Sequence, residues 1–323
     1  MVRRPAHSVR QELLLGVDVG GTKVAAGLVT SHGEILSQKR VAMVSNDSAE
    51  RGLQAVFAAI AQLLPDSPSS VSGIGICAPG PLDPKTGVIL NPPNIPCWRN
   101  FPLSAEVRKK YSIPVLVDND ANAAALAEAR WGAARGYKHL FYATIGTGIG
   151  TGIVLDGTIY HGHTGSAGEG GHVSIDYRGP ICRCGKPGCI EILASGTAIA
   201  RRAREKLATG VKSCVGDLVI GNFEAINGEI IQKAYGAGDR FATELLEETV
   251  EMLALWFGNM IDLLDPDIIV IGGGAAALYL PLFDRLRERI PQLTLNPRAG
   301  EVLLVSARYG VDSGVAGGAA LCV

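Results

Sequence analysis

Long apolar runs are missing from this 323-residue chain. No stretch approaches the roughly 18 apolar residues that a membrane-spanning helix needs. Residues 1–11 are basic and contain Pro5 and His7, and the apolar stretch from Leu13 to Leu15 is too short for a secretion signal. The sequence therefore predicts no membrane partner and a cytoplasmic location.

The chain also lacks an excess of charge of either sign. It has 30 Lys and Arg against 31 Asp and Glu, which gives a formal net charge of −1. Proteins that bind nucleic acids usually present a basic surface, so this balance predicts no nucleic-acid partner. No linker or low-complexity tract is present, and the length suffices for two domains or one large α/β unit.

Glycine, by contrast, is abundant, with 41 residues in 323 against an average share near 7%. Two glycine-rich turns, Val19–Lys23 and Gly146–Gly152, each separate two short apolar runs, a pattern typical of β-hairpins. We expect strands at 13–18 and 24–29 in the first, and at 140–145 and 153–155 in the second. The first turn lacks P-loop spacing, yet its hydroxyl, ammonium and bare N–H groups could cradle a phosphate. The repetition predicts an internal duplication with one phosphate loop in each half.

Two more predicted strands lead into bare backbone. Residues 71–77 run into the corner Ala78–Pro81, and residues 267–271 run into Gly272–Gly274 before a helix. Strand ends of this kind often bind ligands in α/β sheets, and a helix N-terminus favours an anion. Tight strand–helix packing explains the triple glycine almost as well.

A carboxylate stands at the end of another predicted strand, 114–117. Asp120 follows it and precedes a helix predicted over 123–131. It could cap that helix or act as a general base whose ionised form the helix N-terminus favours, and both roles can hold at once. Asn94, on a loop, could be a ligand or simply a turn residue.

Three of the seven cysteines lie within eight positions, with a histidine shortly before them. Together they make the Cys3His donor set of a closed tetrahedral zinc site, and the alternative is a disulfide or thiols that are close by chance. An odd cysteine count and the lack of a secretion signal argue against a disulfide. We therefore predict a structural Zn²⁺ held by His172, Cys182, Cys184 and Cys189. Carboxylates at both ends of this stretch, Glu169 and Glu191, suggest that it also positions polar groups around a ligand.

Apolar residues at helical or alternating spacing predict the remaining elements. We expect helices at 48–64, 196–207, 239–264, 280–290 and 314–321, short helical pieces within 217–238, and a strand at 302–306.

Four of these motifs occur in an order that resembles the ROK family, which comprises bacterial sugar kinases and related repressors. They are Asp18–Lys23, Asn119–Asn122, Gly146–Gly152 and Glu169–Glu191, and the resemblance covers nearly the whole chain from Leu13 onward. It implies an α/β chain with the two-domain actin-like/hexokinase (ribonuclease H-like) ATPase fold and an interdomain cleft. The expected domains are residues 1–118 with a C-terminal helix at 312–323, and residues 119–311. The second domain includes the segment Glu169–Glu191 with the four zinc donors, which we call the knuckle.

The resemblance also implies a role for each motif residue. Asp120 corresponds to the catalytic base, and the sugar ligands would be Gly80, Asn94, Asn119, Asp120, Glu169, His172 and Glu191. The phosphates of ATP and its Mg²⁺ would be bound by Asp18, Gly20, Gly21, Thr22, Lys23, Gly146, Thr147 and Gly148, with Gly273 and Gly274 beside the adenosine. We expect a homo-oligomer, either a dimer or a tetramer.

The segment from Gly87 to Leu103 looks most like the glucokinase branch of that family. Pro93, Pro96 and Trp98 should make its loop stiff and bulky, leaving little room beside C2 of a sugar, so we expect glucose 6-phosphorylation. The alternatives are an N-acetylmannosamine, N-acetylglucosamine or fructose kinase, or a non-catalytic sugar-sensing regulator. Repressors of the family carry a DNA-binding domain before the first hairpin, and only 17 residues precede Asp18 here. The choice between ATP and polyphosphate as donor stays open.

Overall fold

The computed structural model describes residues 12–64 and 71–323, which divide into two compact units. Unit 1 runs to Trp131 and takes in Asp312–Val323, and unit 2 comprises Gly132–Val311. The division comes after Trp131 rather than after residue 118, because the helix that follows residue 119 packs on the C-terminal helix of unit 1. The start of the expected first domain, residues 1–11, lies outside the described residues.

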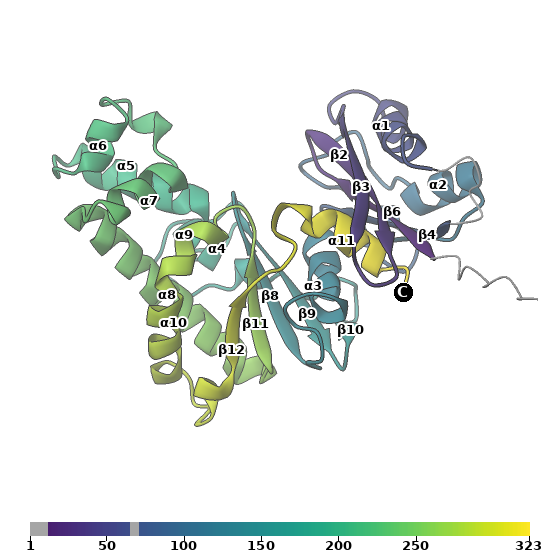
Figure 1. Ribbon diagram of the computed structural model, residues 1–323. Helices are drawn as coiled ribbons and strands as arrows, with labels where there is room; N and C mark the ends of the chain where they lie inside the picture. The colour runs from purple at the N-terminus through teal and green to yellow at the C-terminus, as the bar shows by residue number, and fades with distance from the viewer. Residues whose placement is uncertain (1–11, 65–70) are drawn as a thin grey trace, which may run out of the picture. The chain divides into compact units, whose positions relative to one another are not determined.

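Unit 1 combines strands and helices (Figure 1). Its strands are β1 (Leu13–Val19), β2 (Lys23–Thr30), β3 (Ile35–Ala42), β4 (Val71–Ala78), β5 (Leu82–Asp83), β6 (Val88–Ile89) and β7 (Val115–Asn119). Its helices are α1 (Ala49–Ala61), α2 (Leu103–Tyr111), α3 (Asp120–Arg130) and α11 (Ser313–Ala320).

Unit 2 has the same mixture of elements. Its strands are β8 (Leu140–Ile145), β9 (Ile149–Leu155), β10 (Thr158–Ile159), β11 (Ile268–Gly272) and β12 (Leu303–Ser306). Its helices are α4 (Ile190–Ala194), α5 (Gly196–Ala208), α6 (Cys214–Leu218), α7 (Gly228–Gly236), α8 (Arg240–Leu264), α9 (Ala276–Tyr279) and α10 (Phe283–Arg289).

The main sheets of the two units share one topology within the described residues. The orders are β3-β2-β1-β4-β7 in unit 1 and β10-β9-β8-β11-β12 in unit 2. In each sheet an antiparallel meander supplies the first three strands, and two parallel strands extend the other side. The duplication expected from the two glycine-rich turns thus has a counterpart in strand order and direction.

Helix α11 lies against the sheet of unit 1 and is built from small residues (Figure 1). A Cβ at Gly16 of β1 would fall on the carbonyl oxygen of Val315, and one at Gly75 of β4 on that of Gly318. Both strands therefore need glycine where the helix backbone crosses them. The mixed α/β class and a helix in the region 314–321 are confirmed.

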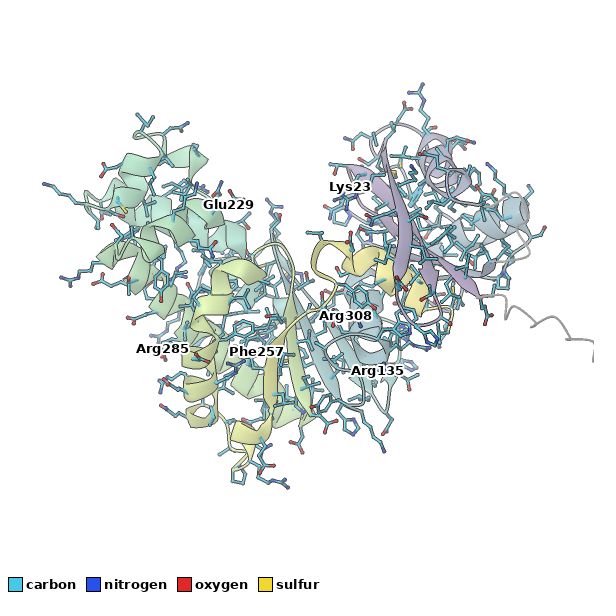
Figure 2. All side chains as sticks on the ribbon, viewed as in Figure 1. Lys23, Arg135, Glu229, Phe257, Arg285 and Arg308 are labelled. Carbon is cyan, nitrogen blue, oxygen red and sulfur yellow. The ribbon has the colours of Figure 1, made fainter. Side chains whose placement is uncertain are left out.

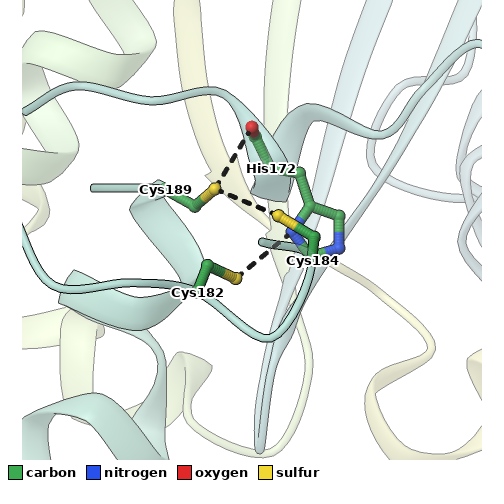
Figure 3. A group of neighbouring side chains, drawn as sticks. All are labelled: His172, Cys182, Cys184 and Cys189. Atoms are coloured by element: carbon green, nitrogen blue, oxygen red, sulfur yellow. Dashed lines mark hydrogen bonds between the residues drawn. The ribbon is translucent and has the colours of Figure 1, made fainter. Parts of the chain in front are cut away.

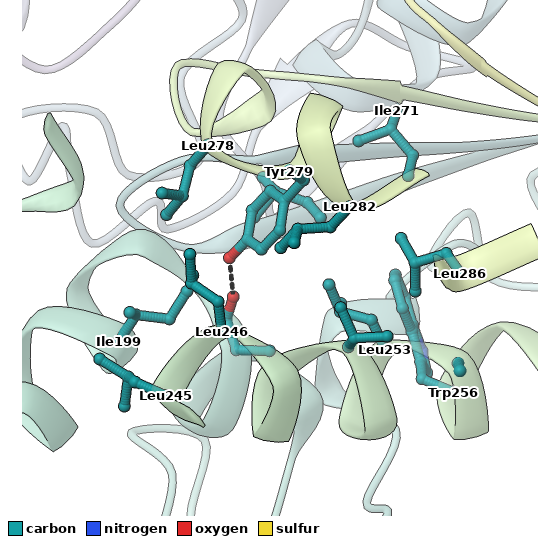
Figure 4. Close-up of a cluster of buried hydrophobic side chains, with 14 of the residues drawn as sticks. Ile199, Leu245, Leu246, Leu253, Trp256, Ile271, Leu278, Tyr279, Leu282 and Leu286 are labelled. Atoms are coloured by element: carbon teal, nitrogen blue, oxygen red, sulfur yellow. Dashed lines mark hydrogen bonds between the residues drawn. The ribbon is translucent and has the colours of Figure 1, made fainter. Parts of the chain in front are cut away.

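The core of unit 2 surrounds α8, whose 25 residues present one long apolar face. Figure 4 shows Leu245, Leu253 and Trp256 of this helix in one buried cluster with Ile271 of β11 and Tyr279 of α9. The Tyr279 hydroxyl is buried and donates to the carbonyl of Ala194 at 2.6 Å. This bond joins the end of α9 to the end of α4.

Some predicted boundaries are wrong. The return strand of the second hairpin begins at Ile149 rather than at 153, since Gly150 and Gly152 pair in the ladder with β8. The segment 280–290 opens with a 3-10 turn at Leu280–Leu282 before α10. Strand β3 had no prediction because it is a largely exposed edge strand without an apolar run. In residues 12–64 and 71–323, no helix has both the length and the apolar character to cross a membrane.

Candidate functional site

Helix α3 begins at Asp120, and its cap is Asn119. The Asn119 side-chain oxygen accepts hydrogen bonds from the N–H groups of Ala121 (2.9 Å) and Asn122 (3.3 Å). The helix therefore starts three residues before the predicted 123. Asn119 is therefore the cap, and the Asp120 Oδ1 shares the N–H of Ala121, from which it accepts at 2.8 Å. The Asp120 carboxylate is exposed in the first turn, where the partial positive charge of the helix favours its ionised form.

Neighbouring strand ends of unit 1 bring the predicted residue Asp18 together with two residues that were not predicted as ligands. Asp18 of β1, Cys77 of β4 and Asp118 of β7 lie side by side in register. Asp118 accepts from the N–H of Asn119 (2.7 Å) and from the side-chain amide of Asn122 (3.2 Å), which fixes the start of α3.

Two glycines of unit 1 bring the backbone close to predicted sugar ligands at this edge. A Cβ at Gly80 would lie 3.6 Å from the side-chain nitrogen of Asn119. One at Gly21 would lie 2.5 Å from the carbonyl oxygen of Asn94. The predicted sugar ligands of unit 1 therefore lie at the same edge of the sheet as its hairpin turn.

The first hairpin turn is closed by the Gly20 N–H, which donates to the Lys23 carbonyl at 2.9 Å. The Thr22 and Lys23 side chains are exposed, and Lys23 is labelled at the start of β2 in Figure 2. Exposed hydroxyl and ammonium groups beside a tight turn are suited to an anion.

Asp18 is partly buried at this edge, and burial raises its pKa. The Cys77 thiol donates to Asp18 Oδ1 at 3.6 Å, and it lies 3.2 Å from the Gly314 carbonyl. Burial, followed by the charges of Asp18 and Asp120, raises the pKa of the Cys77 thiol well above its usual range. The single thiol hydrogen therefore faces two acceptors, the Gly314 carbonyl and the Asp18 carboxylate.

The second hairpin turn is closed in the same way, by the Gly146 N–H donating to the Gly148 carbonyl at 2.9 Å. Glu191 packs against this turn, because its Oε2 accepts from the Ile149 N–H at 3.0 Å. A Cβ at Gly148 would lie 2.5 Å from the same oxygen. Thr147 is exposed at the tip, and its carbonyl accepts from the Thr197 hydroxyl.

Helix α4 carries Glu191, and its last carbonyls are all bonded to side chains. Arg201 donates to the carbonyl of Ile192 (3.0 Å), Arg202 to that of Leu193 (3.3 Å) and Tyr279 to that of Ala194 (2.6 Å). These bonds satisfy the acceptors that a helix end leaves open, so the short helix holds Glu191 in place.

The knuckle gathers the predicted zinc donors (Figure 3). Cys182 Sγ lies 3.7 Å from His172 Nδ1, and Cys184 Sγ lies 3.5 Å from Cys189 Sγ. The ligand atoms of all four residues lie within 4.8 Å of one another. A tetrahedral zinc with sulfur ligands at about 2.3 Å has sulfur–sulfur separations near 3.8 Å, so three thiols and an imidazole at these distances fit it.

The same stretch also positions Cys189 and Glu191. Gly188 has a φ of +62°, a conformation that L side chains rarely adopt, and it brings Cys189 back toward His172. Cys182 Sγ also lies 3.9 Å from Glu191 Oε1. Because Nδ1 of His172 faces the thiols, Nε2 is the ring nitrogen available to another partner.

A pocket of about 930 Å³ lies wholly in unit 2 and includes the predicted nucleotide residues Gly146, Thr147 and Gly274. Gly273, with a φ of +92°, packs on the backbone of Ile145 behind it. The lining residues that the sequence did not predict come mainly from α5, α7 and the start of α9, and they are Gly196, Thr197, Ala200, Arg204, Ile226, Asn227, Gly228, Glu229, Gln232, Lys233, Ala275 and Leu278. Glu229 can be located on α7 in Figure 2. No short motif marks these positions.

Comparison with known proteins identifies the family. The model of the ROK family matches residues 14–323. The glucokinase of Thermotoga maritima is 36% identical over 95% of this chain and 96% of its own. The structure of a ROK family glucokinase from Streptomyces griseus, in complex with glucose and AMPPNP, is 34% identical with a TM-score of 0.80 and covers 96% of this chain and 98% of its own.

Relatives with other activities match at lower identity. The N-acetylmannosamine kinase of Escherichia fergusonii is 31% identical over 95% of this chain and 97% of its own. The xylose repressor of Caldicellulosiruptor bescii is 31% identical over 86% of this chain and 70% of its own. The family match and the solved relatives confirm the actin-like/hexokinase class of fold. The chain belongs to the ROK family.

Proposed function

We propose that this protein transfers the γ-phosphoryl group of ATP to a hexose, and that glucose, converted to glucose 6-phosphate, is its preferred acceptor. The observation that carries the proposal is the Asp120 carboxylate. It is exposed in the first turn of α3, and Asn119 has taken over the capping of that helix. A solvent-exposed carboxylate placed in this way can accept a proton from a substrate.

Asp120 acts as the general base. It takes the proton of the acceptor hydroxyl as that oxygen attacks the γ-phosphorus, the bond to the bridging oxygen breaks, and ADP leaves. Most of the catalysis is positioning and charge neutralisation, as is usual for phosphoryl transfer. We propose Asn94, Asn119 and the Gly80 backbone as the sugar ligands of unit 1. The proposed sugar ligands of unit 2 are Glu169, His172 and Glu191. Amides and carboxylates suit hydroxyl groups that both donate and accept.

Each unit has a hairpin turn suited to a phosphate. The proposed phosphate-binding residues of unit 1 are Gly20, Gly21, Thr22 and Lys23, and those of unit 2 are Gly146, Thr147 and Gly148. Asp18, which the Cys77 thiol faces, is the carboxylate for Mg²⁺, which neutralises charge on the phosphates when bound. The adenosine occupies the pocket lined by Gly274 and α7, whose volume of about 930 Å³ suits a nucleoside.

Zinc, when bound to the four knuckle donors, supplies a fixed scaffold and takes no part in the chemistry, because four protein ligands leave no open position. With Nδ1 of His172 directed at the thiols, its Nε2 is left to bind a sugar hydroxyl. The metal thereby fixes the orientation of a substrate ligand.

Glucose is proposed from the likeness to two glucokinases at 34% and 36% identity. Trp98 does not add the bulk beside C2 of a sugar that the sequence predicted. The indole is fully buried, stacks on Phe101 and donates to the carbonyl of Ala49 at 3.2 Å. It anchors the loop in the core of unit 1, so it contributes stiffness but no bulk beside a bound sugar.

The test is a phosphorylation assay with ATP over glucose, mannose, fructose, N-acetylglucosamine and N-acetylmannosamine. We expect the highest kcat/KM with glucose, tolerance of mannose and poor use of the N-acetylated sugars. A higher kcat/KM for N-acetylmannosamine would replace glucose and leave the kinase proposal standing. Sugar binding by calorimetry without turnover on any of them would favour the sugar-sensing alternative that the repressor relative represents.

A further inference from the structure

The loop that carries Glu169 is held by one hydroxyl from strand β9. Thr151 lies in β9 and is only 4% exposed. Its Oγ1 accepts from the N–H of Gly170 at 2.8 Å and donates to the carbonyl of Gly168. These groups belong to the residues directly before and after Glu169. A single side chain therefore fixes the backbone on both sides of that carboxylate.

A second side chain, from helix α8, also bonds to this loop. Trp256 of α8 is fully buried, and its indole N–H donates to the Gly170 carbonyl at 3.1 Å. Its ring packs edge-on against Phe141 of β8 at a centroid distance of 5.5 Å. The N–H of Gly170 is thus bonded to Thr151 and its carbonyl to Trp256, and both partners are buried in unit 2.

Thr151 and Gly170 are also complementary in shape. A Cβ at Gly170 would lie 2.7 Å from Thr151 Oγ1 and 3.2 Å from its methyl carbon. The threonine therefore fills the space that a side chain at 170 would take. The 3-10 turn Gly170–His172 begins at this glycine, so the packing also sets the start of the segment that carries His172.

We propose that Thr151 is a positioning residue for sugar recognition, which orients Glu169 through the two backbone groups beside it. This inference rests on the proposed function, in which Glu169 binds a sugar hydroxyl. Glu169 is exposed on its loop, so its own side chain has little to hold it in the protein. The orientation must come from the backbone, and Thr151 supplies it.

The experiment compares Thr151→Val, which keeps the shape and removes the hydroxyl, with Thr151→Ser, which keeps the hydroxyl. Loss of two hydrogen bonds should raise the KM for the hexose about 3- to 30-fold, while kcat and the KM for ATP change less than about twofold. Thr151→Ser should restore the hexose KM to within about twofold of the wild-type value.

Thr30→Val is the matched control. Thr30 is 1% exposed and accepts from two backbone N–H groups, those of His32 and Glu34, at the other end of β2 from the hairpin turn. Thr30→Val should lower the melting temperature about as much as Thr151→Val does and leave the hexose KM unchanged. If Thr151→Val lowers the melting temperature but keeps the wild-type hexose KM, the positioning role is overturned. A wild-type protein that phosphorylates no hexose would instead overturn the proposed function.

A second measurement tests the geometry without any activity. Gly170→Ala should lower the melting temperature by several degrees in the wild-type background, since its Cβ meets Thr151 Oγ1. In the Thr151→Ala background the same substitution should cost clearly less, because the crowded atoms are gone. Equal losses in the two backgrounds would show that Thr151 does not shape the loop at Gly170, and the inference would fail.

Discussion

Asp120 and its neighbour Asn119 divide two tasks that one residue could have performed. Asn119 closes the N-terminus of α3, and Asp120 keeps an exposed carboxylate in the first turn. This division lets the helix tolerate changes in the protonation of Asp120, because its cap does not titrate.

Asp120→Asn tests the base directly. We expect turnover to fall roughly 10²–10⁴-fold, the usual value of a positioned general base, with sugar binding retained. Calorimetric titration with the hexose and a coupled ADP assay measure the two effects separately. Because Asn119 is the cap, the melting temperature should hardly change. Near wild-type turnover would remove Asp120 from the mechanism.

Gly314 gives a second prediction for a single residue. A Cβ there would fall on the carboxyl carbon of Asp18, so Gly314→Ala must displace that carboxylate or the start of α11. We expect a loss of about 1–3 kcal/mol in stability and a raised KM for ATP. Gly300→Ala, where a Cβ meets nothing within 4 Å, is the control. Unchanged ATP kinetics in Gly314→Ala would mean that Asp18 does not serve the nucleotide.

For single residues, the sequence predicts a site well when the residue types and their spacing are enough to identify it. It predicts poorly which neighbours a side chain contacts. The zinc donors could be predicted, because three thiols and an imidazole at close spacing have few other uses. The choice between cap and base at Asp120 could not, since it depends on where the Asn119 side chain points. Trp98 was misjudged for the same reason, because a large side chain on a loop can face the core or the ligand.

Among the elements, α6 and α8 share one carboxylate. Asp239 caps α8 through the Ala242 N–H (2.8 Å), and it also accepts from the N–H of Cys214 (2.9 Å) and the hydroxyl of Ser213 (2.9 Å). Burial opposes its ionisation, but these hydrogen bonds outweigh burial and leave its pKa below the ordinary value.

Asp239→Ala should therefore destabilise the protein by about 1–2 kcal/mol near neutral pH. A lowered pKa in the folded state gives stability that is present above the unfolded value, near 4, and is lost as pH falls through the folded value. The difference between wild type and Asp239→Ala should shrink correspondingly in acid. Asp239→Asn keeps a cap that does not titrate, so the stability difference between Asp239→Asn and Asp239→Ala should not depend on pH. Urea unfolding at pH 7 and at pH 3 measures both differences. A difference between wild type and Asp239→Ala that is the same at both pH values would contradict the assignment.

The knuckle provides a prediction about metal. Freshly purified protein should carry about one zinc per chain, and Cys184→Ser should lose it, together with part of its affinity for the hexose through His172. Cys97→Ser, a thiol outside the four donors, should keep the metal. Atomic absorption on protein prepared without chelators measures this. Zinc-free wild-type protein would rule out the proposed metal site.

Local chemistry also determined which elements were predictable. The two hairpins and α8 follow from apolar runs with glycine or a cap at their ends. Strand β3 does not, since it is a mostly exposed edge strand. Helix α7 is one of the short helical pieces expected within 217–238, but its pocket-lining residues belong to no motif that would mark them as ligands.

On the scale of the whole chain, the repeated sheet order explains why the candidate residues occupy corresponding places in both units. Each unit presents a glycine-rich hairpin turn, and a further backbone corner follows the first parallel strand, β4 in unit 1 and β11 in unit 2. The two units differ in the side chains they carry. Unit 1 has acidic and amide side chains at its sheet edge, whereas unit 2 has the four zinc donors and the pocket.

The glycine-lined contact between α11 and the sheet of unit 1 also sets the order of events at the ribosome. Unit 2 is one continuous segment, whereas unit 1 must wait for residues about 190 positions beyond Trp131 before Gly16 and Gly75 are covered. At about 5–20 residues per second, that wait is roughly 10–40 s. During it the sheet of unit 1 exposes the backbone that α11 will cover. Nascent unit 1 therefore stays incomplete until the end of synthesis, whereas unit 2 is continuous and needs no later segment.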